Sequence, residues 1–527
     1  MSTAIFTGTT ALGDWVIILP VVLALLGAAL LLMLRFAPKM AAIVALLVVA
    51  VIIACDAALL LRVLDGGPIS MTMGRWLPPF GISFAVDGFG AGFALVAAAM
   101  TLVVLFYGLG ERADDGFYPL VLLLLAGVSG AFLTGDLFNL YVWFEVMLVA
   151  SFGLMVLGGR PLQFDGAVKY GFLNFLATSF FLVGLGLLYG LLGTLNMADI
   201  IGRAPGANAA ALTGVAALMV LAFGIKAAVF PLNTWLPASY HTPPAAVSAL
   251  LGGLLTKVGA YAMLRVLVML MPVAREQLEG VLVAIAIGTL IVGPLGAIAE
   301  TNLRRAIGFM LIGGIGAIIA GIAMASLHGI GGAGLYIVHA MATLTALYLV
   351  AGLIEHLTGE TDSRRMGGLY AAHAPVSILF FVLVLAVAGV PPFLGFWPKL
   401  LLLEGGLGAA DLRGAGDAGI DWISLALVLA LLVNAVLTLI AGTRLWAHIF
   451  WREGHEGQHS EHRSAPLHAL SGRQSWFGLG ATAVLVLAIV AAGLWPNSLF
   501  EAALLGAGDL LDPAAYGAAV GLAGGMP

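Results

Sequence analysis

Two similar stretches, each rich in proline, decide the fold of this chain. The first reads Lys226-Ala227-Ala228-Val229-Phe230-Pro231-Leu232-Asn233-Thr234-Trp235-Leu236-Pro237, and the second reads Val390-Pro391-Pro392-Phe393-Leu394-Gly395-Phe396-Trp397-Pro398. In each, two prolines are separated by five residues, and each stretch ends a long apolar run. Proline lacks a backbone N–H and leaves a carbonyl free, so we expect helix breaks at Pro231 and at Pro391 and Pro392. Simple proline kinks are the alternative.

The composition is that of a membrane protein. Of the 527 residues, 62% are hydrophobic and 9% are charged, and the mean hydropathy is +1.10. A soluble domain has roughly 25% charged residues, so we predict a polytopic membrane protein that lies in a lipid bilayer. The net charge of −5 and the lack of a basic patch argue against nucleic-acid binding. Cys55 is the single cysteine, so no internal disulfide is expected.

Apolar runs long enough to cross a bilayer predict about 14 transmembrane helices. The expected spans are 15–35, 40–62, 82–107, 117–134, 137–158, 170–193, 211–230, 244–271, 278–298, 303–326, 332–355, 374–396, 421–447 and 476–497. We expect the stretch from Asn196 to Ala204 to lie at the membrane interface, because it is short and polar. More arginine and lysine residues lie in the loops after odd-numbered helices, which predicts that these loops are cytoplasmic and that both termini are outside.

The two proline stretches also predict an internal repeat. They end the seventh and the twelfth span, so they lie an odd number of helices apart and have opposite orientations, as in an inverted-topology repeat. The expected fold is therefore an all-α polytopic membrane protein with two inverted five-helix repeats, helices 4–8 and 9–13, and with broken helices 7 and 12. The expected units are residues 1–110 (helices 1–3), 111–271 (first repeat), 272–450 (second repeat) and 451–527 (histidine-rich loop, helix 14 and C-terminal tail).

Five ionisable residues lie in or beside the apolar runs and are the candidate site: Glu145, Lys226, Lys257, His339 and Lys399. A charge in hydrocarbon costs at least about 2.5–3.5 kcal/mol, so such groups face a bundle interior or a wet cavity and are functional by default. A buried lysine can release its proton, whereas arginine cannot. We expect Glu145 to pair with Lys226 and the set to form a proton relay. A static ion pair, a snorkelling Lys257 and a packing role for His339 are the alternatives.

Polar residues near these positions are candidate auxiliary groups. His241 follows the first break and is expected to link the relay to one water face; Asp136, at the start of the fifth span, is a helix cap or part of a proton entry path. Hydroxyls that could connect titrating groups are Ser248, Thr256, Thr343 and Thr345. Glu300, with Arg304 and Arg305, is expected to cap a helix. Asp56 either pairs with Arg62 or lies near a subunit interface.

Cofactor chemistry is not indicated. His455, His459 and His462 have a spacing that resembles metal ligands, but histidine-rich loops are common, so no metal is predicted. The sequence contains no phosphate-binding glycine loop, haem motif or nucleophile elbow. We therefore expect no cofactor and a secondary ion transporter rather than an enzyme.

Several motifs together resemble those of the proton-translocating antiporter-like family. They are Gly74-Arg75-Trp76-Leu77-Pro78-Pro79-Phe80-Gly81-Ile82 with Val86-Asp87, Phe144-Glu145, Lys226 before Phe230-Pro231, and Pro391-Pro392 with Gly395-Phe396 and Lys399. The family includes three membrane subunits of respiratory complex I and the large subunits of Mrp-type cation/proton antiporters. The resemblance covers nearly the whole chain, and the length and the tail from Leu511 to Val520 resemble those of the D-type members of Mrp antiporters.

The resemblance implies roles for the five residues. Glu145 and Lys226 correspond to the pair that gates the proton path, and Lys257, His339 and Lys399 correspond to later members of the relay. Many relatives carry a further lysine a few residues after the histidine, but this chain reads Ala340-Met341-Ala342-Thr343-Leu344-Thr345 there. The relay would then pass this point through His339, waters and threonines.

The function that the resemblance implies is that of a proton-translocating subunit in a multisubunit sodium (or other monovalent cation)/proton antiporter of a bacterial cytoplasmic membrane. The implied partners are a large A-type subunit and small membrane subunits. One alternative is an antiporter-like proton-pumping subunit of complex I or of a membrane-bound hydrogenase. Another is a scaffold subunit that transports nothing.

Overall fold

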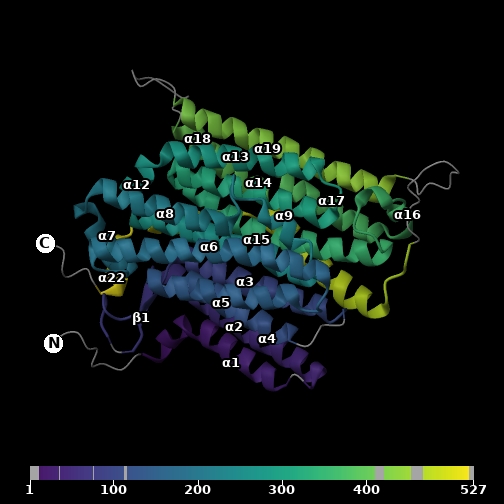
Figure 1. The fold of residues 1–527 in the computed structure, drawn as a ribbon, viewed down its shortest axis with the longest axis horizontal. Coiled ribbons are helices and arrows are strands. Elements are labelled where there is room, and N and C mark those ends of the chain that lie inside the picture. The colour runs from purple at the N-terminus through teal and green to yellow at the C-terminus, as the bar shows by residue number, and fades with distance from the viewer. Residues whose placement is uncertain are drawn as a thin grey trace.

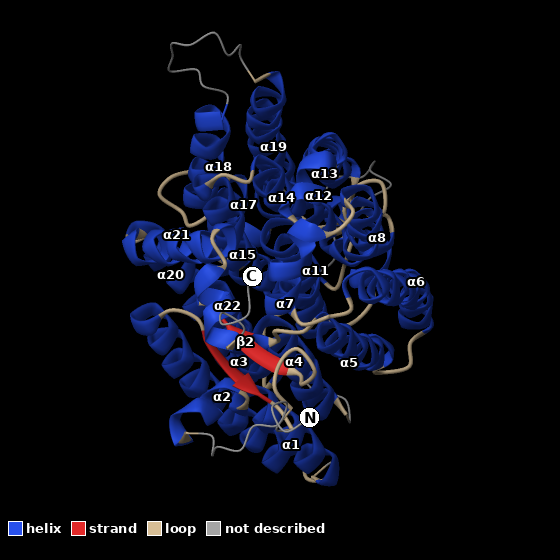
Figure 2. Ribbon diagram, turned by 90° about the vertical axis from the view of Figure 1, so that its left-hand side faces the viewer, coloured by secondary structure: helices blue, strands red, loops and turns tan. Residues whose placement is uncertain are grey.

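In the computed structural model, the described residues are 11–34, 36–74, 76–111, 116–409, 421–452 and 467–521. Most long helices run side by side, from α1 (Leu19–Met33) and α2 (Pro38–Gly66) at one edge to α19 (Trp422–Trp446) at the other (Figure 1). Seen from the side of Figure 2, a small hairpin of two strands lies close to one end of this bundle. The bundle confirms the expected all-α class apart from this hairpin.

Eleven helices within the described ranges are long and apolar enough to cross a membrane. They are α2, α3 (Gly88–Gly108), α5 (Leu137–Val156), α6 (Pro161–Leu192), α8 (Ala209–Ala227), the continuous helix Ala245–Leu270, α13 (Glu279–Ala299), α14 (Leu303–Met324), α15 (Leu327–Thr358), Trp422–Trp451, which extends α19, and Gln474–Leu494, which includes α20 (Gly480–Leu494). Shorter apolar helices are α1, α4 (Phe117–Leu133) and α17 (Ala374–Ala388). The chain is thus a polytopic membrane protein.

The remaining helices lie between or after these spans. They are α7 (Met197–Arg203), α9 (Trp235–Tyr240), α12 (Pro272–Gln277), α16 (Leu369–Ala372), α18 (Phe396–Ala409), α21 (Asn497–Leu511) and α22 (Ala514–Val520). The helix Ala245–Leu270 contains α10 (Ala245–Leu250), the π-helical turn η3 (Leu251–Leu255), α11 (Thr256–Leu264) and the π-helical turn η4 (Arg265–Leu270). Helix α7 coincides with the stretch expected at the interface.

The start of the expected span 82–107 is wrong. Residues Ser83–Val86 form strand β2, which pairs antiparallel with β1 (Ile69–Thr72). Helix α3 begins only at Gly88, because the Asp87 carboxylate caps it by accepting a hydrogen bond from the Gly90 N–H at 2.9 Å. Helix α6 also differs from expectation, since it begins at Pro161 rather than near residue 170.

Burial divides the bundle into a core and a periphery. The helix Ala245–Leu270 and helices α14 and α15 are buried over nearly all of their most apolar stretch, whereas α2 is mostly exposed there. A helix that is apolar all round belongs in the core of the protein or against lipid. The central helices carry Lys257 and His339, so these residues lie in the protein interior.

Local features recur at a constant separation in the chain. Helices α6 and α15 each contain 32 residues. The Leu137 N–H donates to the Leu195 carbonyl at 2.9 Å, and the Leu303 N–H donates to the Thr361 carbonyl at 3.0 Å. The donor and the acceptor of the second bond follow those of the first by the same number of residues. This recurrence supports the expected repeat; its inversion across the membrane stays a prediction.

Candidate functional site

The first helix break follows Lys226. Helix α8 ends at Ala227 and α9 begins at Trp235, with Pro231 between them. The chain leaves the helix through Ala228, whose φ is 60°. The Trp235 indole Nε1 donates to the Ile225 carbonyl at 3.0 Å, so a carbonyl at the end of α8 gains a partner inside the protein. The seventh helix is therefore interrupted where the prolines predict.

The second break holds Lys399 against the end of the preceding helix. Helix α17 ends at Ala388 and α18 begins at Phe396. The buried Lys399 Nζ donates to the Ala388 carbonyl at 2.7 Å and to the Val387 carbonyl at 3.3 Å. The last carbonyls of a helix carry partial negative charge. The end of α17 therefore stabilises the ammonium, which forms no ion pair with a carboxylate of the described residues.

Lys226 does not form the expected ion pair. Its Nζ lies 4.7 Å from the centre of the Phe144 ring, in a cation–π arrangement. Among the ion pairs of the described residues, none joins Lys226 to Glu145 within 4 Å. Glu145 is half-buried on α5, next to Phe144. The close ion pair is therefore not formed in this structure: the Phe144 ring covers the ammonium, and Glu145 acts on Lys226 electrostatically from beyond 4 Å.

Helix α11, which carries Lys257, packs on α8 at Lys226. Lys257 is fully buried, and its Nζ donates to the Gly252 carbonyl at 2.5 Å. That carbonyl belongs to the π-helical turn η3, and such turns are frequent at functional sites. A Cβ added at Gly259 would lie 3.2 Å from the Lys226 Cβ, so the two helices are in close contact at Lys226.

His339 lies between α11 and the second break. Its Nδ1 is 3.1 Å from the Thr343 hydroxyl, one turn later on α15. A Cβ added at Gly395 would lie 2.9 Å from the His339 Nε2, so the ring rests directly on the break that precedes Lys399. His339 is also within electrostatic reach of both Lys257 and Lys399. The structure thus brings His339 between the two lysines.

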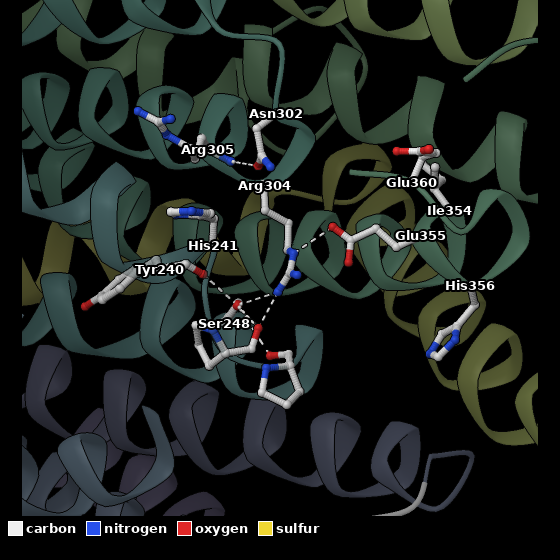
Figure 3. Close-up of polar contacts among 12 residues, drawn as sticks. Tyr240, His241, Ser248, Asn302, Arg304, Arg305, Ile354, Glu355, His356 and Glu360 are labelled. Atoms are coloured by element: carbon white, nitrogen blue, oxygen red, sulfur yellow. Dashed lines mark hydrogen bonds and ion pairs between the residues drawn. The ribbon is translucent and has the colours of Figure 1, made fainter. Parts of the chain in front are cut away.

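Ser248 was expected to connect titrating side chains, but its hydroxyl contacts backbone carbonyls instead. Its hydroxyl donates to the Tyr240 carbonyl at 2.7 Å, in the turn between α9 and α10. Arg304 contacts the same turn through the Pro243 carbonyl and forms an ion pair with Glu355 at 2.7 Å (Figure 3). Ser248 therefore stabilises this turn instead of connecting titrating side chains.

The three candidate threonine hydroxyls make different contacts. Thr343 contacts His339, as described, whereas the Thr345 hydroxyl donates to the Ala249 carbonyl at 3.5 Å and joins α15 to α10. The Thr256 hydroxyl is buried and has no hydrogen-bond partner in the described part of the chain. Of the four expected hydroxyls, only Thr343 contacts a relay residue directly.

His241 and Asp136 lie at helix ends outside the spans. The His241 Nδ1 is 2.9 Å from the Pro237 carbonyl. Burial lowers the pKa of His241 to about 4, and the charges of Arg304 and Arg305 act in the same direction. Asp136 caps α5 by accepting from the Asn139 N–H at 2.8 Å, and burial raises its pKa. The capping interpretation of Asp136 is therefore the one that the geometry supports.

Two other expectations have clear outcomes. Arg62 pairs with Asp14 at 2.9 Å, so the expected pairing of Arg62 with Asp56 is wrong. Asn302, not Glu300, caps α14 by accepting from the Arg305 N–H. The histidines at positions 455, 459 and 462 lie outside the described residues. Within the described ranges, no group of three or more His, Cys, Asp or Glu side chains could hold a metal ion.

The sequence reasoning missed a buried ion pair. Arg265 contacts both carboxylate oxygens of Asp87 at 2.6 Å, and both side chains are about 1% exposed. The Arg265 Nε also donates to the Tyr261 hydroxyl at 2.8 Å, and its Cζ lies 5.4 Å from the Tyr516 ring. The contact joins α3, η4 and α22. An arginine near the end of one apolar run and an aspartate at the start of another were the available signal.

Comparison with known proteins identifies a family model that covers the candidate residues. The family model described as "NADH:quinone oxidoreductase/Mrp antiporter, TM" matches residues 134–415, which contain all five candidate residues. A curated relative, the D subunit of a Na(+)/H(+) antiporter from Bacillus subtilis (strain 168), is 36% identical over 85% of this chain and 90% of its own length.

Two solved structures share the fold over nearly the whole chain. A chain of the Mrp complex from Dietzia sp. DQ12-45-1b is similar with a TM-score of 0.87 and 29% identity, covering 96% of this chain and 99% of that one. A chain of an archaeal membrane-bound sulfane sulfur reductase, a respiratory membrane complex, is similar with a TM-score of 0.85 and 25% identity, covering 96% and 99%. The fold therefore occurs in both antiporter and respiratory complexes.

Proposed function

The chain belongs to the NADH:quinone oxidoreductase/Mrp antiporter membrane family, and we propose that it carries protons as one subunit of a multisubunit sodium/proton antiporter. The partners of this proposal are the other subunits of such a complex, a large A-type subunit and small membrane subunits. The likeness to curated D-type antiporter chains over nearly the full length of both proteins supports this assignment.

The single observation that carries the proposal is the row of titratable side chains in the protein interior. Lys226, Lys257, His339 and Lys399 are all buried. The helix that carries Lys257 packs on α8 at Lys226, His339 rests on the second break, and Lys399 bonds to the end of α17. Intramembrane groups of this kind mark proton paths. Burial without a carboxylate partner lets a lysine exchange its proton.

Electrostatic coupling between neighbouring titratable side chains sets the order in which protons move along the row. With Glu145 beyond ion-pair distance, an ammonium on Lys226 has no close counter-charge and disfavours a proton on Lys257; approach of Glu145 would reverse this, so the groups titrate as a coupled set. The proton on Lys257 then moves toward His339 and Lys399. At the position where relatives carry a further lysine, the Thr343 hydroxyl beside His339 supports a route through these two side chains.

The test compares matched variants of the intact complex in membrane vesicles. We expect Lys226→Ala and Glu145→Ala to abolish sodium-driven proton flux while the complex still assembles. Lys39→Ala, which changes an exposed lysine outside the row, is the control and should retain normal flux. Wild-type flux from the assembled Lys226→Ala complex would sink the proposal.

The alternative is a proton-pumping subunit of a redox-driven complex. The likeness to a chain of a respiratory membrane complex favours it as the second candidate. Proteins that co-purify with the chain decide between the two, because a redox-driven complex requires iron–sulfur partners. The placement of both termini outside the cytoplasmic membrane belongs to the proposal and is testable by labelling of introduced terminal cysteines from either side.

A further inference from the structure

The Lys226 ammonium lacks ordinary hydrogen-bond partners. It is buried, and its Nζ lies over the Phe144 ring. In the described part of the chain, this Nζ makes no ion pair within 4 Å and no hydrogen bond to a protein atom. An ammonium has three N–H donors, and leaving buried donors unpaired is costly. Another polar group must therefore satisfy at least one of them.

A small cavity with both polar and apolar walls adjoins Lys226. Its volume is about 20 Å³, and its wall includes Lys226, Tyr240, Tyr170 and Asn174. A cavity needs roughly 10–15 Å³ and two to four polar partners to hold one water molecule. The cavity therefore has room for about one water and the polar groups to bind it.

Tyr240 is the second unsatisfied group at this cavity. Its side chain is 1% exposed, and its hydroxyl has no hydrogen-bond partner within the described ranges. The ring is held by Trp235, whose centroid is 5.5 Å away at nearly a right angle. Tyr170 lines the same cavity, but its hydroxyl already bonds to the Ser151 hydroxyl at 2.6 Å. Of these two tyrosines, only Tyr240 has a hydroxyl without a hydrogen-bond partner among the described residues, so only this hydroxyl requires a partner in the cavity.

We propose that this cavity binds one ordered water between Lys226 and the Tyr240 hydroxyl. Through this water, Tyr240 passes protons between Lys226 and the side of the protein that bears the loops after odd-numbered helices. The inference rests on the proposed transport function and adds a residue and a water site to it. The hydroxyl accepts a proton from the water on one side as it releases its own on the other. Tyr240 therefore stays neutral, and no other reactant is needed.

The surroundings of Tyr240 supply a continuation toward that face. A second buried hydroxyl without a partner in the described residues, that of Tyr348, is within electrostatic reach of Tyr240 and of Arg304. Arg304 belongs to the cluster in Figure 3, where it pairs with Glu355 and contacts the turn that follows Tyr240. Glu355 is followed on α15 by His356, which contacts Glu111 at 3.1 Å and is partly exposed. Polar groups thus continue from Tyr240 to the protein surface.

The test removes the hydroxyl oxygen of Tyr240. Tyr240→Phe in the intact complex should lower sodium-driven proton flux in vesicles by at least about tenfold, since a positioned proton-transfer group typically contributes 10²–10⁴-fold. Tyr189→Phe is the matched control, because it makes the same change at an exposed tyrosine of α6 outside the cavity; it should retain flux within about threefold of wild type. A solvent isotope effect that increases in Tyr240→Phe would distinguish proton transfer from packing.

A structural measurement tests the water separately. A high-resolution map of the complex should contain density for one water between Lys226 and Tyr240, and that density should weaken in Tyr240→Phe. Flux at the wild-type level in Tyr240→Phe, with Lys226→Ala inactive, would overturn this inference and leave the proposed function standing. Normal flux in Lys226→Ala would instead overturn the proposed function itself. A map without density in the cavity of the wild-type complex would also overturn the inference.

Discussion

The buried contact between Asp87 and Arg265 leads to a quantitative prediction on stability. Asp87→Asn removes the carboxylate charge and leaves the buried Arg265 guanidinium without its ion-pair partner, with only the more distant, half-buried Asp509 within electrostatic reach. Arginine cannot become neutral by losing its proton. Breaking one side of a buried ion pair typically costs roughly 3–5 kcal/mol. The two 2.6 Å contacts and the near-complete burial of both side chains place this pair fully in that class.

The cap on α3 adds to this cost. The Asp87 carboxylate also accepts from the Gly90 N–H, and Ala at such a cap costs roughly 1 kcal/mol. We therefore expect Asp87→Ala to destabilise the chain by roughly 1 kcal/mol more than Asp87→Asn. Asp87→Asn combined with Arg265→Met should recover most of the loss, because replacement of both charges by a neutral pair is often close to neutral.

The assay is unfolding of the purified chain in mixed micelles by titration with sodium dodecyl sulfate. Asp14→Asn is the matched control, because Asp14 pairs with Arg62 where both side chains are more than a third exposed. Such an exposed pair is worth about 0–1 kcal/mol. A cost of Asp87→Asn no larger than that of Asp14→Asn, or a double variant as unstable as the single one, would refute the reasoning.

Two further predictions concern the breaks. The folded pKa of His241, about 4, lies below the ordinary value of about 6.5, so folding favours neutral His241 and stability should fall as the pH is lowered from about 6.5 toward 4. His241→Gln should flatten this part of the pH dependence of the unfolding midpoint, and an unchanged slope would contradict the assignment. Gly395→Ala would place a Cβ 1.9 Å from the Ala386 carbonyl oxygen and 2.9 Å from the His339 Nε2, so we expect a loss of roughly 1–3 kcal/mol in stability and reduced proton flux. Gly408→Ala, on the helix α18 that follows Gly395, should change neither, because an added Cβ there meets no neighbour within 4 Å among the described residues.

Much of the fold could be predicted from local pattern. An apolar run that spans a bilayer must satisfy its backbone hydrogen bonds within itself, so its length alone predicts a helix. The breaks near Pro231 and Pro392 are equally local, because the missing N–H acts on the same segment. Strand β2 was missed for the same reason: the mostly apolar stretch Ser83–Val86 is separated from α3 only by its cap, Asp87, and its pairing with β1 is what distinguishes it from the helix.

The sequence by itself determined which groups are titratable inside the membrane, because hydropathy and residue type are properties of each segment. Only the tertiary structure decided what those groups touch. The Lys226 ammonium lies over an aromatic ring, with Glu145 beyond ion-pair distance, and Lys399 is held by carbonyls of the preceding helix. Asp87 contacts Arg265 although 178 residues separate them in the chain. These partners depend on how helices pack and on which backbone groups the breaks leave free. No periodicity along a single segment records that information.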